Sequence, residues 1–325
     1  MCSCARQFSR RHRSSNNECR TMTARAPKPT LADAEFRLLT SILRERAGLH
    51  FDESTRFLVE RRIARRIDEG DFGSFASYLY QIRHGENADD EFANLVDLLT
   101  THETYFFRER AQLDALIREI IPEMLACKGG GSGPVQIWSA GCASGEEPYS
   151  IVMLALELGL VPGRDFQISA SDISRSVLAR ARTGLYRDAS FRDADASLRI
   201  RYFSRKDGVS KLSDEVRRHV DFMHLNLVDE AKLALLGTMD VILCRNVTIY
   251  FDLTTKKRVM KSFHEKLRPG GCLLLGHSES LANVTTAFEL KHLKRELVYR
   301  RPVLGEERDE IWHSLARAGI DQAED

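Results

Sequence analysis

A glycine-rich turn near the middle of the chain is followed by acids rather than by the bases that hold phosphate. The segment Ser139–Ser150 has the sequence SAGCASGEEPYS. Gly141 and Gly145 permit a close approach of the backbone to a ligand. A phosphate-binding loop places Lys and then Ser or Thr after the glycine, whereas Glu146 and Glu147 would repel phosphate. The turn therefore predicts a neutral or cationic ligand.

An aspartate ends the next apolar run of the sequence. Asp172 follows a run at residues 166–169, and an acid at the end of this second strand is placed to accept hydrogen bonds from both hydroxyls of a ribose. An N-cap for a helix that starts at Ile173 is the alternative, and the two roles can coexist. A ribose acid beside a phosphate-rejecting turn favours S-adenosylmethionine over NAD or ATP, because that cofactor carries an ammonium and a sulfonium but no phosphate.

Two more groups of polar residues could face the same site. Arg245 and Asn246 follow an apolar run at its carboxyl end, and Tyr250 lies four residues further on. For Arg245 alone, an ordinary surface position is the alternative. Earlier in the chain, Thr104 and Arg108 are four residues apart and would share one face of a helix.

The composition bounds the class of protein that must position these residues. A chain of 325 residues with 43% hydrophobic content is long enough for roughly two domains of about 150 residues each. It excludes collagen-like, purely coiled-coil and wholly disordered proteins. The 48 basic and 47 acidic residues give a net charge of +1, so nothing in the overall charge indicates nucleic-acid binding.

The apolar runs are too short to cross a membrane, and the N-terminus lacks an apolar signal core, so a cytoplasmic protein is predicted. The seven cysteines form no CxxC pair. A disulfide framework and a structural metal site are therefore not expected. Cys142, Cys244 and Cys272 are interpreted as small buried side chains rather than nucleophiles.

The predicted fold is α/β, with a small all-helical N-terminal domain before a doubly wound, Rossmann-like domain. Helical apolar spacing gives way after a glycine-rich loop to short apolar runs that alternate with helices, which is typical of a parallel sheet. The predicted segments are a disordered basic tail (1–29), a helical domain of four helices (30–100), a linker helix (101–134), the α/β domain (135–302) with a small inserted antiparallel β subdomain (186–226), and an acidic tail (303–325).

The second predicted helix has two contrasting faces. Val59, Ile63 and Ile67 form its apolar stripe, and the opposite arc is predicted to carry four arginines: Arg61, Arg62, Arg65 and Arg66. Such a charged face is usually only solvated. It could instead dock on an acidic helical bundle and steer the encounter, an effect that salt would weaken.

Five motifs in order resemble one known family. These are Thr104–Arg108, Gly141–Ser150, Ala170–Ser174, Cys244–Phe251 and Gly276–Ser280. They are similar to the chemotaxis receptor methyltransferases of the CheR type, over about residues 30–301. The resemblance implies an enzyme that transfers the methyl of S-adenosylmethionine to glutamate side chains on the cytoplasmic helices of chemoreceptors, leaving S-adenosylhomocysteine.

The resemblance also assigns residues. At the family's cofactor-contacting positions stand His102, Thr104, Arg108, Glu146, Asp172, Asn226, Leu227, Arg245 and Asn246. Arg108 and Tyr250 are the pair implied nearest the transferred methyl; we hypothesise that Arg108 orients the acceptor carboxylate and that Tyr250 borders the sulfonium. The docking role of the four arginines gains support, because receptor methylation regions are Glu-rich helices. The inserted segment corresponds to a subdomain that binds a receptor peptide in some members, although a purely structural role is equally open.

The sequence departs from the family pattern at three places. His102 stands where Asn is more frequent, Ala143-Ser144 where Ser-Thr is more frequent, and Thr248 where an aliphatic residue is more frequent. Three other function classes are weighed as well. A nucleic-acid or small-molecule methyltransferase would share the cofactor turn, a non-catalytic cofactor-sensing or receptor-binding module would keep the fold without turnover, and an NAD-dependent oxidoreductase would need the absent GxGxxG motif.

Overall fold

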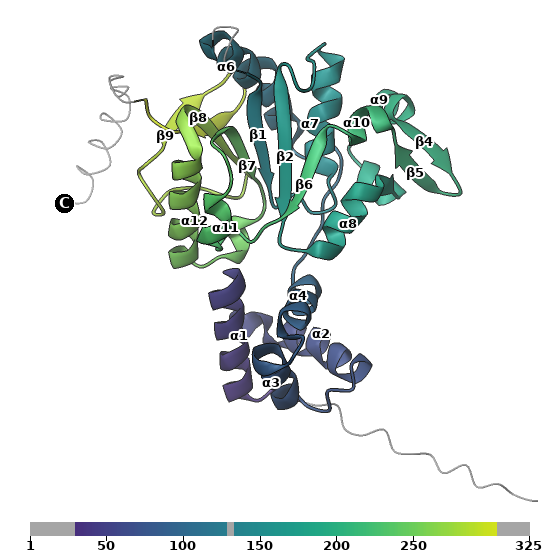
Figure 1. Cartoon of the computed structure of the whole chain (residues 1–325), viewed down its shortest axis with the longest axis vertical. Helices are drawn as coiled ribbons and strands as arrows, with labels where there is room; N and C mark the ends of the chain where they lie inside the picture. Colours follow the sequence, from purple (N-terminus) through teal and green to yellow (C-terminus); the bar gives the residue numbers. More distant parts are fainter. Residues whose placement is uncertain (1–29, 129–132, 304–325) are drawn as a thin grey trace, which may run out of the picture.

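The computed structural model describes residues 30–128 and 133–303. The predicted basic tail, nearly all of the predicted acidic tail and most of the predicted glycine-rich loop lie outside these residues. Figure 1 shows the arrangement of the described part: four N-terminal helices lie below one end of a twisted sheet that has helices on both of its faces.

The N-terminal part is an all-helical domain, as the apolar spacing predicts. Its elements are α1 (Asp33–Ala47), the short 3-10 helix η1 (Glu53–Thr55), α2 (Arg56–Glu69), α3 (Phe75–His84) and α4 (Ala88–Leu99). Each of the four α-helices turns its apolar stripe inward. The centre of this domain holds side chains without exposed surface, namely Leu39, Leu43, Ile63, Tyr78, Ile82 and Leu95.

The end of α1 is locked against the α/β domain. The helix stops at Gly48, which has a φ of 72°, and a Cβ at this position would lie 2.7 Å from Val228 Cγ1. The backbone then pairs Leu49 with Phe251, and the His50 N–H donates to the Tyr250 carbonyl at 2.9 Å. The close approach requires glycine at position 48 and brings the helical domain to the edge of the sheet.

A continuous helical segment links the two domains. It consists of α5 (Arg110–Ala115), the π-helical turn η2 (Leu116–Ile120) and α6 (Ile121–Lys128). The nine residues before it are not helical, so the prediction that Thr104 and Arg108 share a helix face is wrong. Phe106 and Phe107 are buried in the α/β domain. The Phe106 N–H donates to the Ser190 carbonyl and the Phe107 N–H donates to Ser150 Oγ, so neither group is available to a helical turn.

The α/β domain contains a seven-stranded sheet with the order β6-β2-β1-β7-β8-β10-β9. Its strands are β1 (Val135–Ala140), β2 (Phe166–Asp172), β6 (Val220–His224), β7 (Met239–Cys244), β8 (Leu267–Leu275), β9 (Glu289–His292) and β10 (Leu297–Arg300). The first five strands in the order are parallel, and β10 is antiparallel to both of its neighbours. The predicted doubly wound parallel sheet is confirmed.

Helices cover both faces of this sheet. They include α7 (Glu146–Glu157), α8 (Arg175–Thr183), α11 (Glu230–Ala234) and α12 (Leu253–Lys266). The short 3-10 helix η4 (Thr248–Tyr250) lies between β7 and α12 in the chain. Successive residues of β7 enter opposite cores: Ile242 packs in the cluster that contains Phe263 of α12, and Val241 in the cluster that contains Ile151 of α7. Figure 1 shows α12 and α7 on opposite sides of the sheet. Burial on both faces explains the continuous apolar strand runs.

A small antiparallel sheet is inserted after α8. Its elements are β3 (Leu185–Tyr186), η3 (Asp188–Phe191), α9 (Ala196–Tyr202), β4 (Phe203–Lys206), β5 (Val209–Leu212) and α10 (Asp214–Arg217). The predicted insertion over 186–226 is too long at its end, because Val220–His224 is β6, an edge strand of the main sheet parallel to β2. The sequence could not separate the two, since β6 has only five residues and only Val220 among them is buried.

Candidate active site

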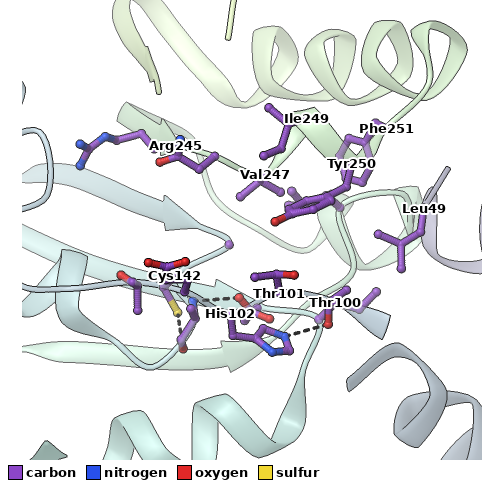
Figure 2. Close-up of a pocket in the computed structure, with 18 of the residues that line it drawn as sticks. Leu49, Thr100, Thr101, His102, Cys142, Arg245, Val247, Ile249, Tyr250 and Phe251 are labelled. Atoms are coloured by element: carbon purple, nitrogen blue, oxygen red, sulfur yellow. Dashed lines mark hydrogen bonds between the residues drawn. The ribbon is translucent and has the colours of Figure 1, made fainter. Parts of the chain in front are cut away.

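A cavity of about 210 Å³ lies at the carboxyl ends of β1, β2 and β7. This edge is where ligands bind in open α/β sheets. Residues 100–104 and Arg108 form another wall, and Ala47 and Leu49 bring the end of α1 to its rim. Figure 2 shows the Tyr250 ring across the pocket from Thr101 and His102, with Leu49 near one end. The site is therefore shared between the two domains.

The glycine turn after β1 forms the floor of the pocket. Gly141 and Gly145 have φ values of 83° and 91°, and Ala143 between them has a φ of 47°. A Cβ on Gly141 would lie 2.3 Å from Val247 Cγ2, so glycine is required for the turn to meet the loop after β7. The Gly141 N–H also donates to the Ser171 carbonyl at 2.8 Å, which fixes the turn to the end of β2.

Asp172 lies at the centre of this edge. One carboxylate oxygen accepts the Ala143 N–H and the other accepts the Ser174 N–H, both at 2.9 Å. Burial raises the pKa of this carboxyl, while the two backbone hydrogen bonds and His102 lower it. The N-cap of α8 is Ser174, whose hydroxyl accepts the Val177 N–H; the N-cap alternative for Asp172 is thus wrong. Each carboxylate oxygen keeps a further acceptor site for a ligand.

The two acids after the glycine turn have separate roles. Glu146 does not line the pocket; its buried carboxylate accepts the hydroxyls of Ser144 and Ser190 at 2.8 and 3.0 Å, and burial raises its pKa. Glu147 does line the pocket and accepts the Ser139 hydroxyl at 2.7 Å. The acidic character of the turn is predicted from both residues, but the resemblance assigns only Glu146 to a cofactor contact. Adjacent helical residues point about 100° apart, and the motif does not show which of them faces inward.

Arg245 is a deeply buried charge of the site, with 2% of its side chain exposed. Its guanidinium contacts Glu147 at 3.0 Å and Glu109 at 2.9 Å, and it donates to the Arg108 carbonyl at 2.7 Å. Figure 2 shows it extending away from Tyr250. The guanidinium therefore ties the linker to α7, and two carboxylates outweigh its single positive charge.

Arg108 lies between two residues in the left-handed region. Phe107 has a φ of 63° and Glu109 a φ of 51°, conformations that cost non-glycine residues free energy and persist where neighbouring contacts hold them. Those contacts are the Arg245 hydrogen bond and the bond from the Phe107 N–H to Ser150 Oγ. The Arg108 side chain lines the pocket and donates to the Glu103 carbonyl at 3.2 Å.

The structure brings the other predicted site residues to the same pocket. Those that line it are His102, Thr104, Asn226, Leu227, Asn246 and Tyr250. The His102 ring bonds to the Thr100 hydroxyl at 2.9 Å, and the Asn226 amide donates to the Arg46 carbonyl at 2.6 Å, another link between the domains. Their contacts with a cofactor stay predictions.

Several lining residues were missed by sequence reasoning. They include Ala47, Leu49, Thr100, Glu103, Val247, Ile249 and Phe251. Leu49 carries no local signal, since it reaches the site only through its pairing with Phe251. The interpretation of Cys142 and Cys244 as buried side chains is confirmed, and burial raises the pKa of both thiols well above the usual value.

The four arginines of α2 divide into two pairs. Arg61 and Arg65 are exposed. Arg62 donates to the Leu98 and Leu99 carbonyls at 3.0 Å, and Arg66 forms two hydrogen bonds to Glu91 at 2.8 and 2.6 Å. The prediction that all four lie on one outer arc is therefore wrong, because Arg62 and Arg66 pack against α4.

The pocket suits a cationic nucleoside. Asp172 and Glu147 bring two carboxylates to it, and the charge of Arg245 is offset by Glu147 together with Glu109. Glu103 also lines the cavity, but its carboxylate is paired with Arg192 at 2.8 Å. A doubly wound sheet with an acid at the end of β2 and an acidic glycine turn is the site of an S-adenosylmethionine-dependent methyltransferase. This is the class of enzyme that the fold and the site define.

Comparison with known proteins gives the family. The model "CheR methyltransferase, SAM binding domain" matches residues 102–297, and "CheR methyltransferase, all-alpha domain" matches residues 34–100. The chain belongs to the CheR family of methyltransferases, and S-adenosylmethionine is its cofactor. The residues named above that line the pocket would hold it.

Curated relatives cover nearly the same length. Chemotaxis protein methyltransferase 2 of Vibrio cholerae is 36% identical over 85% of this chain and 95% of its own. The chemotaxis protein methyltransferase of Vibrio parahaemolyticus is 36% identical over 83% and 98%, and that of Escherichia coli is 35% identical over 80% and 89%. Within residues 30–128 and 133–303, no helix has the length and apolar character needed to cross a membrane.

Proposed function

We propose that this protein is a protein-glutamate O-methyltransferase of the cytoplasm that esterifies glutamates on the cytoplasmic helices of chemoreceptors. The observation that carries the proposal is the shared pocket: Arg108 and Tyr250 line it on the α/β side, and the rim is completed by the helical domain. An acceptor held by the helical domain would thus present its side chain to the cofactor pocket. The relatives are named chemotaxis protein methyltransferase, and this name supports a chemoreceptor as the partner.

The chemistry of the acceptor suits a site without a general base. A glutamate side chain has a reference pKa near 4.3, so it is already a nucleophilic anion at neutral pH. When bound, S-adenosylmethionine supplies a methyl group on a cationic sulfur. The protein must then align the carboxylate and exclude water, and such positioning is worth up to roughly 7–11 kcal/mol in favourable systems. Arg108 is the cation that can orient the carboxylate.

Removing Arg108 tests this role. We expect Arg108→Ala to lower kcat by about 10- to 100-fold, because a hydrogen bond to a charged group is worth about 1.5–3 kcal/mol. The affinity for S-adenosylhomocysteine should change far less. Tyr250→Phe should lower kcat as well if the hydroxyl borders the sulfonium. Kinetics at saturating cofactor measure both, and wild-type turnover in either variant would remove the corresponding residue from the mechanism.

The outer face of α2 is the proposed receptor contact. It carries Arg61 and Arg65 together with Phe57, which is 74% exposed. Two arginines beside an apolar ring fit an acidic amphipathic helix, since charge steers the encounter and the ring adds buried area. Arg62 and Arg66 are excluded from this contact because their guanidinium groups are bonded to α4. The ion pair of Arg65 is with the exposed Glu69 of its own helix, at 3.5 Å, so Arg65 stays on the outer face.

Charge reversal tests this surface. We expect Arg61→Glu combined with Arg65→Glu to raise KM for a receptor fragment by about tenfold, with unchanged cofactor affinity and an effect that shrinks at high salt. The matched control is Arg37→Glu combined with Arg83→Glu, the same change of charge at exposed positions of α1 and α3. Equal KM values for the two double variants would rule out this docking face.

The function itself is tested by the chemistry of the product. The full chain is incubated with methyl-labelled S-adenosylmethionine and receptor cytoplasmic fragments, and the labelled fragment is treated with mild base. A carboxyl ester releases its label as methanol, whereas N-methyl and S-methyl groups keep it. Replacing the acceptor glutamates by alanine should abolish labelling. Base-stable label, or label on no receptor fragment, would contradict the proposal.

A further inference from the structure

Glu279 lies outside the pocket but accepts five hydrogen bonds next to it. Its Oε1 accepts the N–H groups of Val247 and Thr248 at 3.0 and 2.7 Å and the Thr248 hydroxyl at 2.7 Å. Its Oε2 accepts the N–H groups of Asn246 and Gly276 at 2.6 and 2.9 Å. A single carboxylate therefore binds three consecutive backbone N–H groups that follow β7.

These three N–H groups belong to the pocket loop, which we define as residues 246–250. Every member of this loop except Thr248 lines the cavity. Asn246 has a φ of 59°, a left-handed conformation that Asn tolerates better than most residues. With Asn246 left-handed, consecutive N–H groups converge into a concave anion-binding nest. In this protein Glu279 supplies the anion from within the chain.

The backbone around this carboxylate is closely packed. A Cβ at Gly276 would lie 2.9 Å from both Asn246 Nδ2 and Glu279 Oε2. The φ of Gly276 is not positive, so glycine is needed here for space alone. The end of β8 and the pocket loop thus meet around the Glu279 carboxylate without room for another side chain.

We propose that Glu279 is a positioning residue for methyl transfer: by filling the N–H nest of residues 246–248 it fixes the pocket loop, and with it Asn246 and Tyr250. The carboxylate does not touch the cavity and has no part in the chemical step. Thr248, where the family more often has an aliphatic residue, adds one more donor to the same carboxylate. The nest is also closed to external anions, which agrees with a cofactor that has no phosphate.

The isosteric change Glu279→Gln is the direct test. An amide has one acceptor oxygen and one donor group. In either orientation its NH2 would face at least two N–H donors: those of Asn246 and Gly276, or those of Val247 and Thr248. The side chain keeps its shape, but the loop cannot keep its position. Since a misplacement of about 1 Å can cost 10²-fold in rate, we expect kcat/KM to fall by about 10²-fold, mostly through kcat.

Two readouts separate positioning from general stability. Hydrogen–deuterium exchange of Glu279→Gln should accelerate in residues 245–251 and stay unchanged in β1 and α12. Calorimetry should show S-adenosylhomocysteine affinity reduced at least threefold at a temperature where the protein is folded. Faster exchange throughout the molecule, or a misfolded Glu279→Gln protein, would overturn the assignment and give Glu279 a general structural role. An exchange rate in residues 245–251 of Glu279→Gln equal to that of the wild type would also overturn the assignment.

Control variants sharpen the result. Glu289→Gln makes the same chemical change on β9, where the carboxylate faces Arg300 at 3.5 Å, and should leave all readouts within twofold of the wild type. Thr248→Val keeps the shape of threonine but removes its donor, whereas Thr248→Ser keeps the donor. We expect Thr248→Val to have at least threefold lower kcat/KM than Thr248→Ser; equal values would count against the proposal even if Glu279→Gln cannot be purified.

The kinetic test rests on the proposed function for its acceptor, but the other readouts do not. If the wild type methylated no receptor fragment, the proposed function would fail. Exchange in the pocket loop and binding of S-adenosylhomocysteine would still decide the role of Glu279.

Discussion

Asp172→Ala should weaken binding of S-adenosylhomocysteine by about 10²-fold or more. The carboxylate holds the Ala143 and Ser174 N–H groups and is the predicted acceptor for two ribose hydroxyls. Each hydrogen bond to a charged group is worth about 1.5–3 kcal/mol. Losing the two hydrogen bonds to the ribose is therefore enough to reduce the affinity by about 10²-fold, even if the glycine turn does not move. Titration calorimetry on the full chain measures it.

The control is Asp221→Ala, which removes an exposed aspartate from β6, beside β2 in the same sheet. It should bind S-adenosylhomocysteine like the wild type. Comparable losses in the two variants would mean that charge on this part of the sheet, rather than contact at Asp172, governs affinity.

The same carboxyl predicts the direction of a pH dependence. The ionised form accepts hydrogen bonds, so affinity is fully present above the pKa of Asp172 in the folded protein and is lost as pH falls through it. Because burial raises that pKa above the ordinary value of 3.8, the loss should begin at a higher pH than for an exposed aspartate. The affinity of Asp172→Asn should depend less on pH than that of the wild type. If the two proteins lost affinity in parallel as the pH fell, the titrating group would be another residue.

Arg245→Met should lower the free energy of unfolding by about 3–5 kcal/mol, because removing one partner of a buried ionic group leaves the others uncompensated. Here Glu109 and Glu147 would remain without their cation, with 14% and 15% of their side chains exposed. The thermal midpoint should fall by roughly 10 °C, and kcat should fall too, since the Arg108 carbonyl loses its donor. Thermal denaturation and kinetics give both quantities.

Arg268→Met is the matched control. Arg268 also faces a carboxylate, Asp240 at 3.4 Å, but 41% of its side chain is exposed, so its contribution should be below about 1 kcal/mol. Replacing Glu109 and Glu147 by glutamine in the Arg245→Met protein should recover part of the stability. Similar midpoints for Arg245→Met and Arg268→Met would show that burial does not set the strength of these contacts.

The elements and the chemical class could be predicted from the sequence because both are local properties. The spacing of Leu39 and Leu43 indicates a helix face whatever packs on it. The short apolar run before Cys244, which alternates with helical segments, is typical of a strand that is covered on both sides. The glycine turn followed by two acids excludes phosphate through residue types alone. Asp172 ends one parallel strand and Asn246 follows another. Because the carboxyl ends of parallel strands meet at one edge of the sheet, the sequence also predicts that these two residues lie at the same edge.

What local pattern cannot give is the direction of each side chain. Glu146 and Glu147 are neighbours on α7, and only packing against the inserted subdomain turns Glu146 to Ser190 and leaves Glu147 for Arg245. The arginines of α2 are alike in sequence, and only the position of α4 draws Arg62 and Arg66 inward.

The sequence by itself determined a two-domain α/β protein with a cofactor turn made for a cationic nucleoside, because periodicity, glycine and charge act over a few residues. The tertiary structure alone decided that the helical domain completes the pocket through Leu49, and that Glu279 holds a loop about 30 residues earlier in the chain. Both depend on contacts between segments far apart in sequence, whose geometry is set by the packing of the whole sheet and its helices.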